Sequence, residues 1–177
     1  MKNTGKTETL TDFVTGKEVP DTGSEANRQA VEQLLVEKKG FDRSDINVDT
    51  PIELRIDGET YRTTADLVIR VAGRRFMLIK CAAGSLGSRE REALSAARLL
   101  DTYQIPFAAV SDGKNAIVLD TVSGKRIGEG LDAIPAKEEA VKQFQGLPLF
   151  PLPNDRREKE KLIFRSYDSM NVNRAGI

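Results

Sequence analysis

Residues 64–83 of the chain read TADLVIRVAGRRFMLIKCAA, and this stretch decides the fold. From 65 to 71, apolar residues occupy every second position, which is typical of a β-strand with one buried face. After Gly73, the unbroken apolar run at 76–79 is typical of a strand that is buried on both faces. The stretch therefore predicts two antiparallel neighbouring strands that are joined by a turn near Gly73.

The segments on either side extend this sheet. Residues 52–56 alternate up to Asp57-Gly58, a hairpin turn signal, so three antiparallel strands in a meander are predicted. Alanines and leucines at helical spacing before residue 100 predict a helix, with Ser88 as its N-cap. Two further strands are predicted at 106–111 and 116–120. The order strand, helix, strand favours parallel pairing of the third and fourth strands.

The two ends of the chain complete the architecture. Apolar residues at helical spacing predict a first helix over 24–38, with Ser24 as its N-cap. The predicted fold class is α/β (α+β), a mixed sheet in the order α-β-β-β-α-β-β with flanking helices. We divide the chain into an N-terminal arm (1–21), one domain (22–135) and a C-terminal part (136–177). The last part contains a short helix, a proline-rich strip and a short amphipathic terminal helix.

Composition excludes several classes of protein. The chain has 177 residues, with 27 Lys and Arg against 27 Asp and Glu, so it is not a polycation that binds nucleic acid through total charge. It has no histidine, which excludes Ser-His-Asp catalysis and His-ligated zinc. Its single cysteine, Cys81, excludes an intramolecular disulfide. Because no apolar run is long enough to cross a bilayer and no secretory signal is evident, we expect a cytoplasmic protein.

The strand pair around Gly73 carries the first functional signal. Asp66 and Lys80 lie seven positions on either side of Gly73. If the turn has an odd number of residues, their side chains meet on one face of the sheet, whereas a two-residue turn puts them on opposite faces. A carboxylate that binds a divalent metal beside a lysine is a hydrolytic arrangement. The alternative is a cross-strand ion pair with a purely structural role.

Positive charge gathers around the same region. Residues 70–98 contain seven basic and two acidic side chains, a local charge of +5. Arg74, Arg75, Arg89 and Arg91 are therefore candidates for binding nucleic acid, and the alternative is that they are scattered over a solvated surface. Cys81 follows Lys80 in the strand, so we expect its side chain on the opposite face, as a small buried hydrophobic group.

Short motifs along the chain together resemble one family. These motifs are Asp12–Lys17, Glu25–Gln29, Thr64–Ile69, Met77–Lys80 and Pro106–Gly113. With them the chain resembles the PD-(D/E)xK nuclease superfamily, and more closely the N-terminal nuclease domain of type I restriction enzyme R subunits, over about residues 12–135. This resemblance implies a restriction-endonuclease-like fold for residues 22–135.

The resemblance also shows where the chain departs from the family. It implies that Asp66 is a metal-binding aspartate and that Lys80 belongs to a Glu-x-Lys strand. Leu78 stands where the family has the glutamate of that strand, and Glu92 and Ala96 stand where its relatives have a glutamine and a tyrosine. Since Mg²⁺ takes oxygen ligands, Leu78 cannot bind it.

Two other glutamates are candidates to replace the missing ligand. In some restriction enzymes of the superfamily the second acid comes from the helix after the lysine strand, where Glu92 lies. Glu25 is a further oxygen donor by the family match. The resemblance thus implies a Mg²⁺ site, with Mn²⁺ as a substitute, made of Asp66, Glu92 and Glu25. In the alternative, Glu92 is an exposed glutamate that balances Arg89 and Arg91, and Glu25 faces the helix dipole.

Three functions follow from these observations. The first is a Mg²⁺-dependent phosphodiesterase that cleaves DNA with Asp66, Lys80 and Glu92. The second is a catalytically inactive module of the nuclease fold that binds DNA. The third is a protein-interaction subunit that uses the proline-rich strip and the last helix. The sequence leaves enzyme status open, and it predicts DNA as a partner, with a homodimer or restriction–modification subunits as further candidates.

Overall fold

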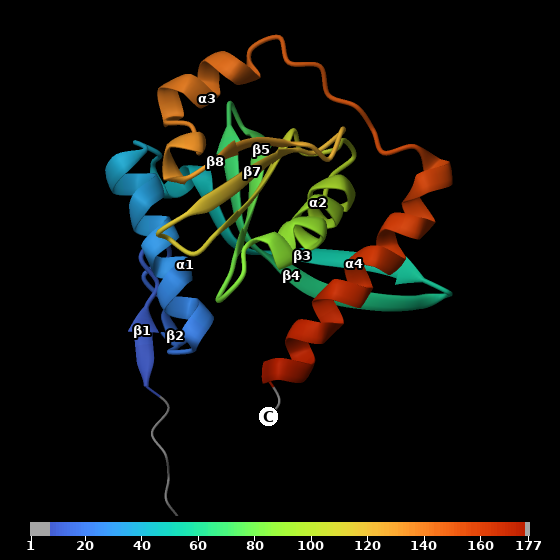
Figure 1. Cartoon of the computed structure of the whole chain (residues 1–177), viewed down its shortest axis with the longest axis horizontal. Helices are drawn as coiled ribbons and strands as arrows, with labels where there is room; N and C mark the ends of the chain where they lie inside the picture. The colour runs from blue at the N-terminus through green and yellow to red at the C-terminus, as the bar shows by residue number, and fades with distance from the viewer. Residues whose placement is uncertain (1–7, 176–177) are drawn as a thin grey trace, which may run out of the picture.

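The computed structural model describes residues 8–175, and the side chains of residues 8–169. Residues 1–7, the first part of the predicted arm, lie outside the described residues. A sheet lies at the centre, with helices packed around it, as Figure 1 shows. The elements are β1 (Thr9–Thr11), β2 (Glu18–Pro20), α1 (Gly23–Gln33), the π-helix η1 (Leu34–Lys38), the 3-10 helix η2 (Arg43–Asp45), β3 (Ile46–Ile56), β4 (Glu59–Val71), β5 (Arg74–Cys81), η3 (Gly87–Arg89), α2 (Glu90–Leu99), β6 (Phe107–Ser111), β7 (Ala116–Asp120), β8 (Arg126–Glu129), η4 (Leu131–Ala133), α3 (Lys137–Phe144) and α4 (Asn154–Ala175).

The central sheet has the strand order β3-β4-β5-β6-β7-β8. Neighbouring strands of this sheet are antiparallel, except for β5 and β6, which are parallel and are connected through α2. The predicted meander is β3-β4-β5 and the predicted parallel pair is β5-β6, so both predictions are confirmed, as is the mixed α/β fold class. The sequence analysis did not predict β8 at the sheet edge, or the small sheet that β1 and β2 form.

Hydrophobic layers cover both faces of the central sheet. On one face, α2 and α4 pack over the sheet, and Leu78 of β5 and Phe164 of α4 belong to this layer. On the other face, α1 and α3 contribute Val31 and Ala140, which pack in a layer with Ile79 of β5. Because β5 sends Leu78 to one layer and Ile79 to the other, the prediction of a strand buried on both faces is confirmed.

The turn between β4 and β5 differs from the expected one. Ala72 and Gly73 form a two-residue turn, and both have positive φ, 51° and 75°. By itself this turn would place Asp66 and Lys80 on opposite faces of the sheet. A β-bulge, in which Phe76 is the extra residue of β5, shifts the register back. Asp66 and Lys80 therefore lie on the same face because of the bulge, and not because the turn has an odd number of residues.

Two predicted N-caps are wrong. The helix α1 begins at Gly23 after Thr22, so Ser24 lies inside it, and the predicted helix 24–38 is α1 continued by the π-helical η1. Ser88 lies within the 3-10 helix η3, ahead of the first residue of α2. Its hydroxyl donates to the carbonyl of Ser85 instead of accepting a hydrogen bond from the helix. The 3-10 helix η3 thus occupies the position at which α2 was expected to begin, whereas α1 begins one residue before its expected N-cap.

The helix α4 is much longer than the predicted terminal helix, with 22 residues, and it is fastened to α2. The buried Glu160 accepts hydrogen bonds from Arg91 and Ser95, both at 2.8 Å, and from Arg98 at 3.3 Å. Burial alone raises the pKa of Glu160, but these donors outweigh it and the pKa is lowered. The proline-rich segment between α3 and α4 arches from one helix to the other (Figure 1).

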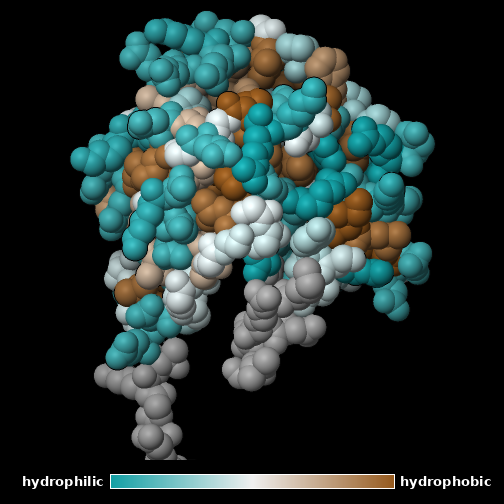
Figure 2. All heavy atoms as spheres, in the orientation of Figure 1, coloured by the Kyte–Doolittle hydropathy of each residue, from teal (hydrophilic) through white to brown (hydrophobic). Residues whose placement is uncertain are grey.

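The surface is mainly polar. Figure 2 shows hydrophilic side chains over most of the visible face, with hydrophobic residues in separate small areas. Among the described helices, none combines the length and the apolar character that crossing a membrane requires. Among the side chains of residues 8–169, the large hydrophobic ones that remain exposed are Val122, Ile127, Val141, Phe150 and Leu162.

Candidate functional site

Three charged side chains from three elements converge beside β5. Asp66 comes from β4, Lys80 from β5, and Glu92 from the first turn of α2. The Nζ atom of Lys80 lies 3.5 Å from Oδ2 of Asp66 and 3.3 Å from Oε1 of Glu92. The structure thus brings together the three residues to which the sequence analysis gave catalytic roles, and the roles themselves stay predictions.

Lys80 is the centre of this cluster. Burial by itself lowers the pKa of Lys80, but the carboxylates of Asp66 and Glu92 outweigh burial, so the pKa is raised and the side chain stays charged. Glu92 is buried and also pairs with Arg89 at 3.4 Å. Oδ2 of Asp66 accepts a hydrogen bond from the backbone N–H of Cys81 at 2.8 Å. The Cys81 side chain lies in the opposite hydrophobic layer, as predicted.

A depression of about 520 Å³ opens beside Lys80. Its walls are formed by residues at the start of α1, by Asp66 in the middle of β4, by the end of β5 and the residues that follow it, and by Arg89 of η3. Its charged lining residues are Glu25, Arg28, Asp66, Lys80 and Arg89. The third predicted metal ligand, Glu25, therefore faces the same depression as Asp66, whereas Glu92 lines a narrow crevice next to it.

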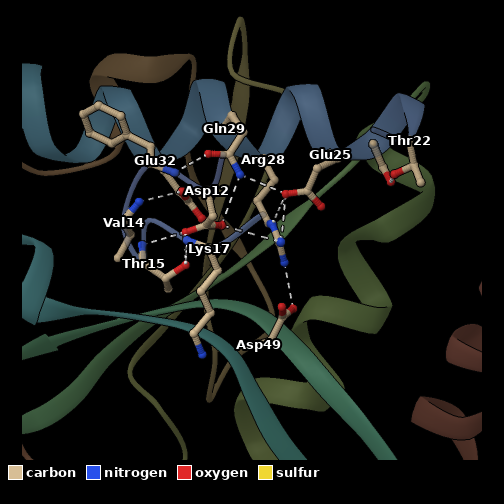
Figure 3. Close-up of polar contacts among 12 residues, drawn as sticks. Asp12, Val14, Thr15, Lys17, Thr22, Glu25, Arg28, Gln29, Glu32 and Asp49 are labelled. Atoms are coloured by element: carbon tan, nitrogen blue, oxygen red, sulfur yellow. Dashed lines mark hydrogen bonds and ion pairs between the residues drawn. The ribbon is translucent and has the colours of Figure 1, made fainter. Parts of the chain in front are cut away.

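Hydrogen bonds from its own helix hold Glu25 in place (Figure 3). Its Oε1 atom accepts from Nε of Arg28 at 2.9 Å and from Nε2 of Gln29 at 2.9 Å. Arg28 also donates to Asp49 of β3 at 2.7 Å. Burial alone lowers the pKa of Arg28, but the charges of Asp49 and Glu25 outweigh it and the pKa is raised. Glu25 is thus a member of a polar network that joins α1 to β3.

At position 78, where the family resemblance requires an acid, a leucine fills the hydrophobic core. Leu78 is 2% exposed and belongs to the same layer as Ala93 and Ala96 of α2. Asp66 and Glu92 both point at the ammonium of Lys80. Among the side chains that are described, no group of three or more acidic, histidine or cysteine residues is arranged to hold a metal ion. Since Mg²⁺ binds through one or two carboxylates and several waters, it would have to displace the Lys80 ammonium from both acids, and in this arrangement the donors do not fit it.

The sequence analysis missed one acidic residue near this cluster, Asp168 of α4. The hydroxyl of Tyr61 donates a short hydrogen bond to Oδ2 of Asp168, and that of Thr63 donates to Oδ1 at 3.3 Å. Asp168 lines the crevice that contains Glu92, and its charge also acts on Lys80. It lies four residues after the buried Phe164, and this spacing places both side chains on the same face of α4.

Two of the four arginines predicted to bind nucleic acid belong to existing ion pairs near α2. Arg89 lines the depression beside Lys80 and pairs with Glu92. Arg91 makes two hydrogen bonds to Glu160, at 2.8 and 3.2 Å, and so fastens α4 to α2. The structure gives Arg91 an architectural task, and its predicted role in nucleic-acid binding is untested.

The other two arginines lie at a second depression, of about 720 Å³, which they share with Arg70. Arg75 pairs with Asp101 at 3.3 Å. The guanidinium carbon of Arg74 lies 4.9 Å from the centre of the Tyr103 ring. Arg70 donates to a backbone carbonyl of the β4–β5 turn. The four predicted arginines therefore lie in three places. Arg89 lines the depression beside Lys80, Arg74 and Arg75 line the second depression, and Arg91 joins α2 to α4.

One comparison with known proteins gives a match. A family model described as "Type I restriction enzyme R protein N terminus" matches residues 23–135, more than half of the chain. The matched region begins with α1 and contains the whole central sheet and α2, including Asp66, Lys80 and Glu92. It does not include the β1–β2 hairpin or α4. No curated protein and no solved structure matches the chain significantly.

Proposed function

The chain belongs to the family of type I restriction enzyme R protein N termini, and from this premise we propose that it is a DNA-binding module that does not cleave DNA. In this proposal the chain keeps the restriction-endonuclease-like arrangement of the PD-(D/E)xK superfamily. The charge cluster around Lys80 then stabilises the fold instead of binding a metal. Subunits of a restriction–modification complex are the partners that the family favours, and a homodimer is a further prediction.

The observation that carries this proposal is the position of the Lys80 ammonium. It lies within 3.5 Å of Asp66 and within 3.3 Å of Glu92, so both carboxylates already have a counter-charge. Leu78 supplies no oxygen ligand and is buried in the core. A hard divalent cation would have to displace the ammonium of Lys80 from both carboxylates before it could bind them. The cluster is therefore better suited to structural stabilisation than to metal-dependent hydrolysis.

The second depression supports binding to the DNA backbone. Arg70 and Arg74 line it, and no carboxylate in the described part of the chain forms an ion pair with either of them. Guanidinium groups bind phosphate oxygens, and their affinity does not depend on base sequence. We expect the phosphate backbone to contact Arg70 and Arg74 directly, with Arg75 held by Asp101 as a supporting cation.

A cleavage assay tests the first half of the proposal. The purified chain is incubated with supercoiled and linear DNA in the presence of Mg²⁺ or Mn²⁺, and we expect no cleavage above that of a Lys80→Ala control. Cleavage that needs the metal and disappears in Asp66→Ala and in Lys80→Ala would overturn the proposal. Cleavage that persists in both variants would point to a contaminating nuclease and not to this chain.

Fluorescence anisotropy with labelled duplex DNA tests the second half. We expect the affinity to fall with salt, and the double variant Arg70→Ala/Arg74→Ala to reduce the salt slope by about one for each lost phosphate contact. Arg62→Ala is the matched control, because Arg62 is an exposed arginine of β4 that pairs with Glu53 away from the depression. Equal loss in the control and in the double variant would contradict a specific role for the depression.

A second candidate function is metal-dependent phosphodiester cleavage at Asp66, Glu92 and Lys80. The convergence of these three side chains favours it. Calorimetry with Mn²⁺, carried out on the wild type and on Glu92→Gln, separates the two functions. Tight binding that Glu92→Gln abolishes would favour this candidate, and no measurable heat in either protein would favour the non-cleaving module. Leu78→Glu then tests whether a restored acid creates metal binding.

A further inference from the structure

The β1–β2 hairpin is attached to α1 through side chains of the helix (Figure 3). The side-chain oxygen of Gln29 accepts the backbone N–H of Phe13 at 2.6 Å, and its amide nitrogen donates to Asp12 at 3.1 Å. Glu32, one turn further along the helix, accepts the backbone N–H of Val14 at 3.2 Å. These contacts are polar, so the attachment of the hairpin depends on the charge of the groups that make it.

Asp12 and Glu32 place two carboxyl groups in one buried space. Asp12 is 1% exposed and Glu32 is 0% exposed, and Figure 3 shows them side by side beneath α1. Asp12 accepts the N–H and the hydroxyl of Thr15, at 2.8 and 2.9 Å, in addition to the amide of Gln29. Oε1 of Glu32 accepts a hydrogen bond from no donor among the described residues. One acid is thus well supplied with donors, and the other has an oxygen without one.

Two ionised carboxylates in contact in such a space would repel each other. Arg28 approaches Asp12 to 3.7 Å, but its shorter contacts are with Glu25 and Asp49. We infer that Glu32 is protonated in the folded chain, that its hydroxyl donates to Asp12, and that this proton is a pH-sensitive latch that fastens the β1–β2 hairpin to α1. The inference concerns the N-terminal hairpin and does not depend on DNA binding.

The groups that surround Glu32 agree with this assignment. Asp12 faces it from the hairpin, Arg28 from its own helix, and the thiol of Cys81 from β5. Burial, followed by the charge of Asp12, raises the pKa of Glu32 to about 8, against the smaller opposite effect of Arg28. Burial also raises the pKa of the Cys81 thiol, so this group stays neutral over the same range.

The direction of the pH effect follows from proton linkage. A glutamate in water has a pKa near 4.5, whereas the docked hairpin keeps the proton on Glu32 up to about pH 8. Docking is therefore fully favoured below pH 4.5, weakens as the pH rises from there, and loses this contribution as the pH passes 8. The pKa of Asp12 is lowered from 3.8, because donors such as Thr15 and Gln29 outweigh burial, so Asp12 stays ionised throughout this window.

Amide hydrogen exchange of the full chain, measured by NMR between pH 5 and 9, tests the latch. After correction for the intrinsic pH dependence of exchange, we expect the protection of Phe13, Val14 and Thr15 to fall by up to about tenfold per pH unit below pH 8, and then to level off. The amide of Ile79 in the core serves as an internal reference. An equal fall at Ile79 would mean global unfolding and would overturn the inference.

Two variants complete the test. Glu32→Gln keeps a donor toward Asp12 without an ionisable group, so the protection of the hairpin should no longer depend on pH. Glu37→Gln is the matched control, because Glu37 is exposed on the following π-helix, and it should behave as the wild type. A direct carboxyl ¹³C titration of wild-type Glu32 is independent of any variant. A midpoint near 4.5 in that titration would overturn the latch.

Discussion

Two pairs of neighbouring carboxyl groups in this chain, Asp66–Glu92 and Asp12–Glu32, are stabilised in different ways. Asp66 and Glu92 have the ammonium of Lys80 between them, and it forms an ion pair with each of them. Asp12 and Glu32 have no such cation between them, and a shared proton takes its place. The first pair is balanced by the positive charge of a lysine, whereas the second pair changes charge near pH 8.

The difference shows why the lysine weighs against metal binding. A bound divalent cation would neutralise Asp66 and Glu92 in the same way as Lys80 does now. Where a lysine already neutralises the acids, the fold is stable without metal. The Asp12–Glu32 pair has no cation between its two acids, only Arg28 at 3.7 Å from Asp12, and its oxygens are used to hold the hairpin. Neither acid lines either of the two depressions described above. Neither pair, therefore, presents a set of acids that is ready for a metal.

Removal of the lysine should have the largest effect. Lys80→Met leaves Asp66 and Glu92 together without their common counter-charge, and we expect unfolding to become easier by about 3 kcal/mol. We take the lower end of the range for buried pairs because the side chains of Lys80 and Asp66 are 20% and 22% exposed. Urea denaturation at pH 7 measures the loss.

The same variant has a pH signature. The pKa of Lys80 is raised in the fold, so its contribution is present at neutral pH and is lost as the pH rises through the raised pKa. The loss of stability in the variant should therefore stay the same between pH 5 and 7 and shrink only at alkaline pH. Leu78→Met is the control for a change of side-chain volume at the neighbouring core position, with an expected cost below about 1.5 kcal/mol. A loss that remained unchanged at alkaline pH would mean that the charge of Lys80 does not account for it.

Glu160 is a further buried acid, and it is paired with two arginines, Arg91 and Arg98, instead of with a lysine or a proton. Glu160→Gln should cost about 2 kcal/mol in urea denaturation, because its hydrogen bonds to Arg91 and Arg98 lose their carboxylate. The pKa of Glu160 is lowered in the fold from 4.5, so its contribution is present at neutral pH and is lost as the pH falls through the lowered pKa. Glu158→Gln, at an exposed position of α4, should change stability little.

The strand pattern predicted the sheet well because strand signals are local. Alternation and turn residues gave the meander, and the strand–helix–strand order gave the parallel pair β5-β6. The turn at Gly73 could not be resolved in the same way. Whether the side chains of Asp66 and Lys80 lie on the same face depends on both the turn and the bulge at Phe76. Two consecutive apolar residues at 76–77 do not predict a bulge.

The sequence predicted those residues of the candidate site that lie in the region resembling the family. Asp66, Lys80 and Glu92 carry charge at positions that a strand pair and a helix bring together. Asp168 was missed because its role comes from contacts of α4 with Tyr61 and Thr63, which are distant in the sequence. Arg91 was assigned to nucleic acid because nothing local reveals its pairing with Glu160 of the same distant helix.

The smallest effect should come from a change on the Asp12 side of the proton-sharing pair. Asp12→Asn removes the charge that is the second cause of the raised pKa of Glu32, while burial, the first cause, remains. The pKa of Glu32 should therefore fall below 8 and stay above 4.5, a difference on the order of 1 kcal/mol for each pH unit of the fall. Carboxyl ¹³C titration of the variant measures it. If the value stayed at 8, Asp12 would not act on Glu32 at all, and burial alone would distinguish this pair from the one that Lys80 neutralises.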